Sequence, residues 1–142
     1  MDLGTNNKIG GGGFHHVAIK VHDFDASVRF YSEGLGFKER LSWGEGDGRA
    51  TLLDTGDGNY LEVFAGGSKE IKPDGSMIHM AFRTDDVAKA IEVARAAGAE
   101  VTIEPKAINI SQNPLTPVII AFCKGLDGEV IEFFQSTGDN QL

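Results

Sequence analysis

The chain has 142 residues, of which 41% are hydrophobic, and a formal net charge of −8 at pH 7. This length suits one domain, or two small modules that share a core. The acidic balance offers no basic surface to neutralise phosphates, so nucleic acid is not an expected partner. No apolar run reaches the roughly 18–20 residues of a membrane helix, so no membrane association is expected. The single cysteine excludes an intrachain disulfide framework and favours a cytoplasmic location.

The first half of the chain predicts a β-α-β-β-β module over residues 14–66. A polar, glycine-rich stretch, residues 1–13, precedes it and predicts a flexible N-terminal segment. Period-2 alternation predicts a strand at 14–21, and Asp23 or Asp25 can cap a helix that ends near Gly34–Gly36. The apolar stripe of this helix is Phe24, Val28, Tyr31 and Leu35. Three further strands are expected at 37–42, 49–54 and 59–64, separated by glycine-rich turns.

The second half repeats this order. A linker is predicted at 67–76, a second module at 77–136 and a C-terminal tail at 137–142. A strand at 77–84 leads to a helix capped by Asp85 or Asp86 and closed by Gly98. Its buried stripe is Val87, Ala90, Ile91 and Ala94. Strands at 100–104, 118–123 and 129–135 follow, and two prolines predict a long loop at 109–117.

The two modules also share a sequence motif at each end. Each begins His-x-Ala-x-(Lys/Arg), at 16–20 and at 79–83, and each ends with Asp-Gly-x-x-(Leu/Ile)-Glu-(Val/Phe)-Phe, at 57–64 and at 127–134. Alternation along a strand places the His and the cation of one opening motif on the same face. The opposite faces are uniformly apolar and can pack against the helices.

These patterns predict an α+β fold in which two βαβββ modules form a cup-shaped mixed sheet with helices on its outer face. The cup would carry two imidazoles and two carboxylates at its base. The expected metal ligands are His16, Glu62, His79 and Glu132. Neutral imidazole and carboxylate suit divalent Zn, Ni, Fe, Co or Mn, and this set contains no thiolate for a soft metal.

Further side chains are candidates for binding a small-molecule substrate. Lys20 and Arg83 would lie about 13 Å along the strand from their histidines, where they can attract an anionic group or simply remain solvated. Three aromatic residues share strand faces with the glutamates and are also expected at the substrate: Tyr60, Phe64 and Phe134. Trp43, beside a glycine-rich loop, lines the mouth of the cup or covers the sheet edge.

The motifs together resemble a known superfamily. The segments that carry the resemblance are His16–Ile19, Phe30-Tyr31 through Gly34–Phe37, Leu61–Phe64, and Asp127-Gly128 leading to Ile131–Phe133. They are similar to the vicinal oxygen chelate superfamily, which includes glyoxalase I, methylmalonyl-CoA epimerase, extradiol dioxygenases, and the fosfomycin and bleomycin resistance proteins. The resemblance covers residues 14–136 and implies a fold more specifically than a reaction.

A His-Glu-His-Glu set is most similar to metal-dependent glyoxalase I. In that enzyme the metal binds both oxygens of an enediolate, and a ligand glutamate moves away to act as general base. The resemblance therefore implies a lyase or isomerase acting on a small carbonyl (carbon-acid) substrate, with Glu62 or Glu132 as the catalytic base. The segment Val63–Gly67 departs from the Tyr-Asn-type segment that contacts glutathione in bacterial glyoxalase I, so glutathione dependence is not implied.

Two other functions remain open at this point. One is a metal-free protein of the bleomycin-resistance type that binds a small molecule in an aromatic cleft. The other is an Fe(II) ring-cleaving dioxygenase, in which one of the four ligands would be a bystander. The resemblance also implies a homodimer, in which each site takes ligands from both subunits or each chain closes its own cup.

Overall fold

The computed structural model of this protein describes residues 5–34, 36–70, 75–125 and 129–142. The predicted helix residue Leu35 and the repeated Asp127-Gly128 pair lie outside the described residues. The chain divides into two compact units, one of residues 16–78 and the other of residues 1–15 with 79–142. The described residues of each unit include one α-helix, so we call them the α1 unit and the α2 unit.

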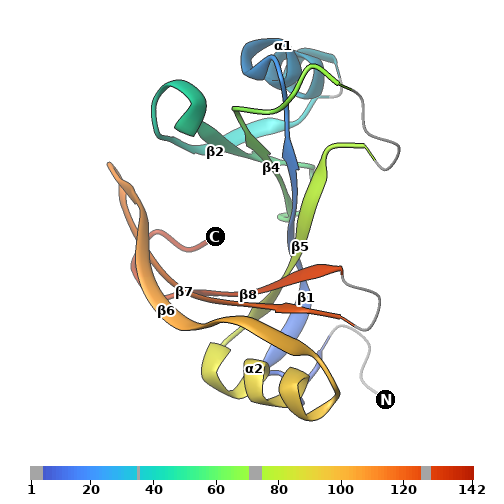
Figure 1. The fold of residues 1–142 in the computed structure, drawn as a ribbon. Coiled ribbons are helices and arrows are strands. Elements are labelled where there is room, and N and C mark those ends of the chain that lie inside the picture. The colour runs from blue at the N-terminus through green and yellow to red at the C-terminus, as the bar shows by residue number, and fades with distance from the viewer. Residues whose placement is uncertain (1–4, 35, 71–74, 126–128) are drawn as a thin grey trace. The chain divides into compact units, whose positions relative to one another are not determined.

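In the α1 unit, four strands are hydrogen-bonded in the order β2-β3-β4-β1 (Figure 1). The strands are β1 (Gly11–Lys20), β2 (Lys38–Trp43), β3 (Ala50–Asp54) and β4 (Tyr60–Phe64), and β1 begins in the other unit. β1 and β4 are parallel, whereas β2–β3 and β3–β4 are antiparallel pairs. Helix α1 (Phe24–Arg29) continues as the π-helix η1 (Phe30–Gly34), and the short 3-10 helix η2 spans Gly46–Gly48.

Local chemistry explains where the first helix begins and what it covers. Asp23 is the N-cap, and its side chain accepts a hydrogen bond of 3.0 Å from the Ala26 N–H. Phe24 and Tyr31 of the predicted stripe pack on the buried cluster Ile19, Leu53 and Val63. The chain turns away after η1 at Gly36, whose φ of +81° suits a residue without a Cβ.

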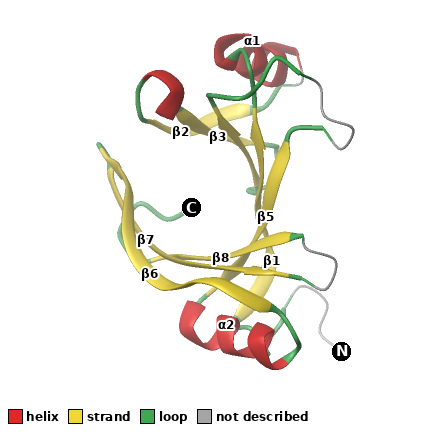
Figure 2. Cartoon of the chain, in the orientation of Figure 1, coloured by secondary structure: helices red, strands yellow, loops and turns green. Residues whose placement is uncertain are grey.

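In the α2 unit, the strand order is β5-β8-β7-β6 (Figure 2). Its elements are β5 (Met77–Thr84, whose first two residues belong to the α1 unit), α2 (Val87–Ala96), β6 (Glu100–Gln112), β7 (Leu115–Lys124) and β8 (Val130–Ser136). β5 and β8 are parallel, and β8–β7 and β7–β6 are antiparallel. This arrangement repeats that of the α1 unit, in which the first and last strands of the module are also a parallel pair.

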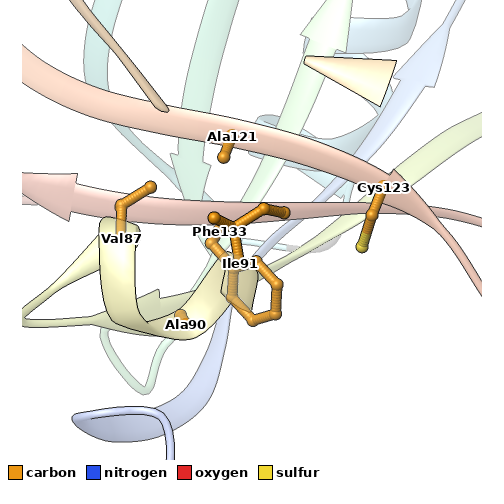
Figure 3. Packing of buried hydrophobic residues seen from close by; sticks show 6 residues of the cluster. All are labelled: Val87, Ala90, Ile91, Ala121, Cys123 and Phe133. Carbon is orange, nitrogen blue, oxygen red and sulfur yellow. The ribbon is translucent and has the colours of Figure 1, made fainter. Parts of the chain in front are cut away.

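The predicted second helix is confirmed. Asp86 is its N-cap and accepts a hydrogen bond of 3.0 Å from the Lys89 N–H. Three residues of the predicted stripe are fully buried and meet side chains of β7 and β8 (Figure 3). The buried cluster consists of Val87, Ala90, Ile91, Ala121, Cys123 and Phe133. Burial, with a smaller contribution from Glu129, raises the pKa of the Cys123 thiol, so we infer an inert core cysteine.

The described part of the N-terminal segment, residues 5–13, packs on the α2 unit. Ile9 contacts the core cluster below α2, and its carbonyl accepts a hydrogen bond from the Thr84 hydroxyl. The Gly10 carbonyl accepts one of 2.7 Å from the Asp85 N–H. Strand β1 accordingly begins at Gly11, three residues before the predicted start. At this start the backbone of Gly11 donates a hydrogen bond of 2.9 Å to Asn6 and accepts one of 2.8 Å from it.

The prediction of a long loop at 109–117 is wrong. Residues 100–124 form a β-hairpin whose strands β6 and β7 pair from Glu100↔Lys124 to Gln112↔Leu115. Pro114 lies in the turn, where it interrupts no ladder. Pro117 is near the start of β7, where it pairs with Asn109 of β6. It precedes the β7–β8 ladder, whose first pair is Val118↔Ser136, so its missing N–H interrupts no bond of that ladder. The two prolines therefore mark a turn and the beginning of a strand, not a loop.

The predicted α+β class and the two βαβββ modules are confirmed. Most strand boundaries differ from the expected ones by only a residue or two; the exceptions are the start of β1 and the β6–β7 hairpin. Among the described residues, no helix is long and apolar enough to cross a membrane.

Candidate metal centre

In the α1 unit, the first predicted His and Glu lie beside each other. His16 is on β1 and Glu62 on β4, and His16 Nε2 is 3.4 Å from Glu62 Oε1. Both residues are buried, with 1% and 7% of their surface exposed. The parallel register pairs Ala18, not His16, with Glu62, so the carboxylate reaches diagonally to the imidazole two residues earlier on β1.

The α2 unit repeats this construction. His79 is on β5 and Glu132 on β8, and His79 Nε2 is 3.0 Å from Glu132 Oε2. Here the register pairs Ala81 with Glu132, again two residues after the histidine. Glu132 is buried, with 5% of its surface exposed, and the ring of Phe122 meets that of His79 edge-on at 5.4 Å.

The alanine of the repeated His-x-Ala motif explains why the same pair forms twice. Ala18 and Ala81 are both fully buried and lie opposite the glutamates in their ladders. A methyl group leaves space on that face, so the carboxylate can turn to the imidazole. A larger side chain at this position would occupy the space between them. The repeated motifs thus specify the histidine and the glutamate and also the alanine that lies opposite the glutamate on the parallel neighbour strand.

Both pairs combine a carboxylate and an imidazole away from water. A buried carboxylate is costly unless it is paired or coordinates a metal. Imidazole nitrogen and carboxylate oxygen are also the donors that divalent transition metals bind in proteins. The donor chemistry and burial of each pair therefore fit a divalent cation.

Two predicted substrate residues, Arg83 and Phe134, contact the segment Phe14–His15 within the α2 unit. The Arg83 guanidinium donates a hydrogen bond of 3.1 Å to the Phe14 carbonyl. The fully buried His15 ring stacks on Phe134, with centroids 3.8 Å apart and planes at 25°. Phe14 in turn stacks on Phe82 at 5.2 Å. These contacts hold the chain immediately before His16. The sequence offers little sign of them, since His15 looks like an ordinary neighbour of His16.

The other candidate substrate residues lie in the α1 unit. Lys20, at the end of β1, is exposed. Tyr60 is buried and Phe64 half-buried on β4. Phe64 pairs with Lys20 in the β1–β4 ladder, four residues beyond the level of His16. Lys20 and Phe64 thus lie at the same end of two strands that also carry His16 and Glu62.

Trp43 lies at the end of β2, the last strand of the order in this unit. It lines a hollow of about 430 Å³ together with Phe24 and Arg49. Arg49 forms an ion pair of 3.0 Å with Asp25 and lies 4.3 Å from the centre of the Phe24 ring. Trp43 therefore lies beside α1 at the sheet edge, one of its two predicted positions.

Comparison with known proteins agrees with this construction. Residues 13–133 match the sequence profile of the Glyoxalase/Bleomycin resistance protein/Dioxygenase superfamily. The chain is 33% identical over 129 residues to the uncharacterized protein YwbC of Bacillus subtilis, covering 84% of this chain and 94% of that protein. It is 28% identical over 127 residues to a probable lactoylglutathione lyase of Vibrio parahaemolyticus, covering 85% of this chain and 88% of the relative.

Solved structures share the fold. Methylmalonyl-CoA epimerase from Mycobacterium tuberculosis superposes with a TM-score of 0.72 at 21% identity, over 94% of this chain and 93% of that one. A variant of the Streptomyces coelicolor epimerase, in complex with 2-nitronate-propionyl-CoA, gives a TM-score of 0.66 at 26% identity, over 88% and 97% of the two chains. The matched profile spans most of this chain, and so the protein belongs to the Glyoxalase/Bleomycin resistance protein/Dioxygenase superfamily.

Proposed function

We propose that this protein is a metal-dependent lyase or isomerase that moves a proton at a carbon next to a carbonyl group. The observation that carries the proposal is the repeated buried His–Glu pair, at 3.4 Å in the α1 unit and 3.0 Å in the α2 unit. Relatives named as lactoylglutathione lyases and structural neighbours named as methylmalonyl-CoA epimerases support the same reaction class.

The proposed metal ligands are His16, Glu62, His79 and Glu132. Each unit supplies one imidazole and one carboxylate, and all four side chains are donor types that a divalent ion accepts. A bound divalent ion would supply Lewis acidity, which stabilises negative charge developing on a substrate oxygen. Zn, Ni, Fe, Co and Mn all accept such a set.

The protein's own chemical step is proton transfer by a glutamate. Glu132 and Glu62 are both buried beside an imidazole, which orients the carboxylate and keeps bulk water away from it. A carboxylate held in this way can remove a proton from a carbon acid and return it to a neighbouring position. We assign this role to Glu132 or Glu62.

Deuterium exchange tests this proposal with two different carbon acids. The metal-loaded protein is incubated in D₂O with methylmalonyl-CoA or with the hemithioacetal of methylglyoxal and glutathione, and NMR measures deuterium incorporation beside the carbonyl. Glu132→Gln removes the base but keeps the size of the side chain. We expect it to slow exchange by about 10²–10⁴-fold.

Glu100→Gln is the matched control, because Glu100 is an exposed glutamate of the same unit, at the start of β6. It should exchange at the wild-type rate. Full activity of Glu132→Gln together with full activity of Glu62→Gln would contradict the assignment of a glutamate base.

The two alternatives make different predictions for the same preparations. A metal-free binding protein would hold a small molecule without metal and catalyse no exchange. A dioxygenase would require Fe(II) and consume oxygen. The four proposed donors, of which three are buried and His79 is half-buried, favour the metal-dependent proton transfer over the metal-free alternative.

We also propose that the protein is a homodimer, as its resemblance to two-module relatives implies. Since one chain has a mass of 15.2 kDa, light scattering coupled to size-exclusion chromatography should give 2 × 15.2 = 30.4 kDa. A mass of one chain at micromolar concentration would contradict the dimer and any site shared between subunits.

A further inference from the structure

Residues 14 and 15 of β1 are attached to the α2 unit by three contacts, which we call the β1 anchor. The ring of Phe14 stacks on that of Phe82, with centroids 5.2 Å apart. The Phe14 carbonyl accepts a hydrogen bond of 3.1 Å from the Arg83 guanidinium. The ring of His15 stacks on that of Phe134, with centroids 3.8 Å apart. Since His15 is fully buried and Phe134 is buried, this last contact is part of the interior.

The anchor uses the two strands that carry the second His–Glu pair. Arg83 of β5 and Phe134 of β8 lie opposite each other in the parallel ladder. Two residues earlier on each strand, Ala81 lies opposite Glu132 in the same ladder. The anchor is therefore built on regular strands rather than on a loop, which suits a group that must hold its partner in one place.

The part of β1 that precedes the anchor has no side chains. Residues 11–13 are all glycines, and the register of a glycine-rich strand is weakly specified because nothing on it packs. Phe14 and His15 are accordingly the first residues of β1 whose side chains can fix the position of the strand. The anchor therefore supplies positional information that the glycines lack.

His16 follows the anchor directly. It is the first residue of β1 in the β1–β4 ladder, where it pairs with Tyr60. Because consecutive Cα atoms are 3.8 Å apart, a fixed His15 leaves the backbone of His16 little freedom to move. Three residues further on, Ile19 is buried in the core cluster of the α1 unit. His16 thus lies between two fixed points of β1, and the anchor is the nearer one.

We propose that His15 is a positioning residue for the proposed metal ligand His16. Its stack on Phe134, together with the hydrogen bond that Arg83 donates to the preceding carbonyl, prevents the start of the β1–β4 ladder from opening locally. The His16 imidazole is thereby held beside Glu62. The adjacent histidines divide two tasks, since one packs in the interior and the other pairs with a carboxylate. The effect on metal affinity rests on the proposed function, whereas the effect on the ladder does not.

The ladder is tested first, on metal-free protein, by amide hydrogen–deuterium exchange followed by NMR. The readout is the exchange rate of residues 16–18 relative to that of β3, because this ratio cancels a general loss of stability. His15→Ala removes the stack, and we expect the ratio to rise severalfold. His15→Phe keeps a flat ring and should restore the wild-type ratio. Arg83→Met removes only the hydrogen bond to the Phe14 carbonyl, spares the buried stack and should raise the ratio less.

Metal affinity is tested next, by competition for Zn²⁺ with a chromophoric chelator. Altering a residue that orients a metal ligand commonly weakens metal binding about 10- to 100-fold, and we expect about tenfold for His15→Ala. His15→Phe should bind Zn²⁺ as wild type does. Failure of His15→Phe to restore both the exchange ratio and the affinity would show that ring stacking is not the mechanism.

Ile91→Ala is the matched control, because Ile91 is a buried residue of the same unit, on α2, outside the β1 anchor. It should lower the free energy of unfolding but leave the exchange ratio and the Zn²⁺ affinity unchanged. An unchanged ratio in both His15→Ala and Arg83→Met, or equal changes in Ile91→Ala, would overturn the proposal. So would a raised ratio with unaltered Zn²⁺ affinity. A wild-type protein that binds no Zn²⁺ would contradict the proposed function instead, and the exchange ratios would still test the anchor.

Discussion

The smallest unit that encodes this candidate centre is the triplet His-x-Ala with a glutamate on the parallel neighbour strand. The histidine and glutamate are the candidate donors, and a buried alanine lies opposite each glutamate in its ladder. The sequence indicated all four residues as candidate donors, because the same types recur at equivalent places in two modules. It could not predict the 3.4 Å and 3.0 Å contacts, which depend on the ladder register.

Other residues had roles that no sequence pattern signals. Arg83 and Phe134 were expected at the substrate because of their strand faces, and both contact Phe14–His15. Arg83 and Phe14, for example, are 69 positions apart in the sequence. Only tertiary structure brings such positions together, so alternation alone could not find it. Their role toward the substrate stays a prediction.

The Phe134 stack gives a prediction at this scale. Phe134→Ala removes a buried ring from beneath His15, and we expect it to lower the free energy of unfolding by about 3 kcal/mol. Phe134→Leu, which keeps most of the volume, should cost clearly less. Urea unfolding of the metal-free protein followed by circular dichroism measures both changes. Phe30→Ala is the control, since Phe30 is 58% exposed, and a loss as large as that of Phe134→Ala would contradict this account.

Among the elements, helices were predicted well and hairpins poorly. Both helices begin at an aspartate that the sequence offered as a cap, and α2 buries three residues of its predicted stripe. A helix cap and the spacing of apolar residues along a helix depend on residues close together in the sequence, so both can be predicted from the sequence alone. The β6–β7 hairpin was missed because its prolines suggest a loop when read locally. Whether a strand tolerates proline depends on its place at an edge or a turn, which is a property of the sheet.

The cap of α2 can be tested directly. Asp86→Ala leaves the Lys89 N–H without its side-chain acceptor, and we expect a loss of about 1 kcal/mol in the free energy of unfolding. Asp86→Asn keeps a good capping oxygen and should lose little. Thermal and urea unfolding measure both variants. Equal losses for Ala and Asn would show that the cap does not stabilise the helix.

At the scale of the whole molecule, two modules of the same order carry one His–Glu pair each. This duplication explains why the superfamily was recognisable from the sequence while the reaction was not. Fold and donor set follow from motifs that recur in the chain itself. The substrate depends on side chains outside those motifs, which no internal repeat marks.

The central claim is that the two His–Glu pairs hold a divalent metal, and elemental analysis by mass spectrometry tests it most directly. The purified protein, the His79→Ala variant and the control His22→Ala, which alters an exposed histidine outside the pairs, are compared after reconstitution with Zn, Ni, Fe, Co and Mn. We predict near-stoichiometric metal in the wild type and in His22→Ala, and its loss in His79→Ala. Absence of bound metal from the wild type after reconstitution, or equal metal content in all three proteins, would contradict the account.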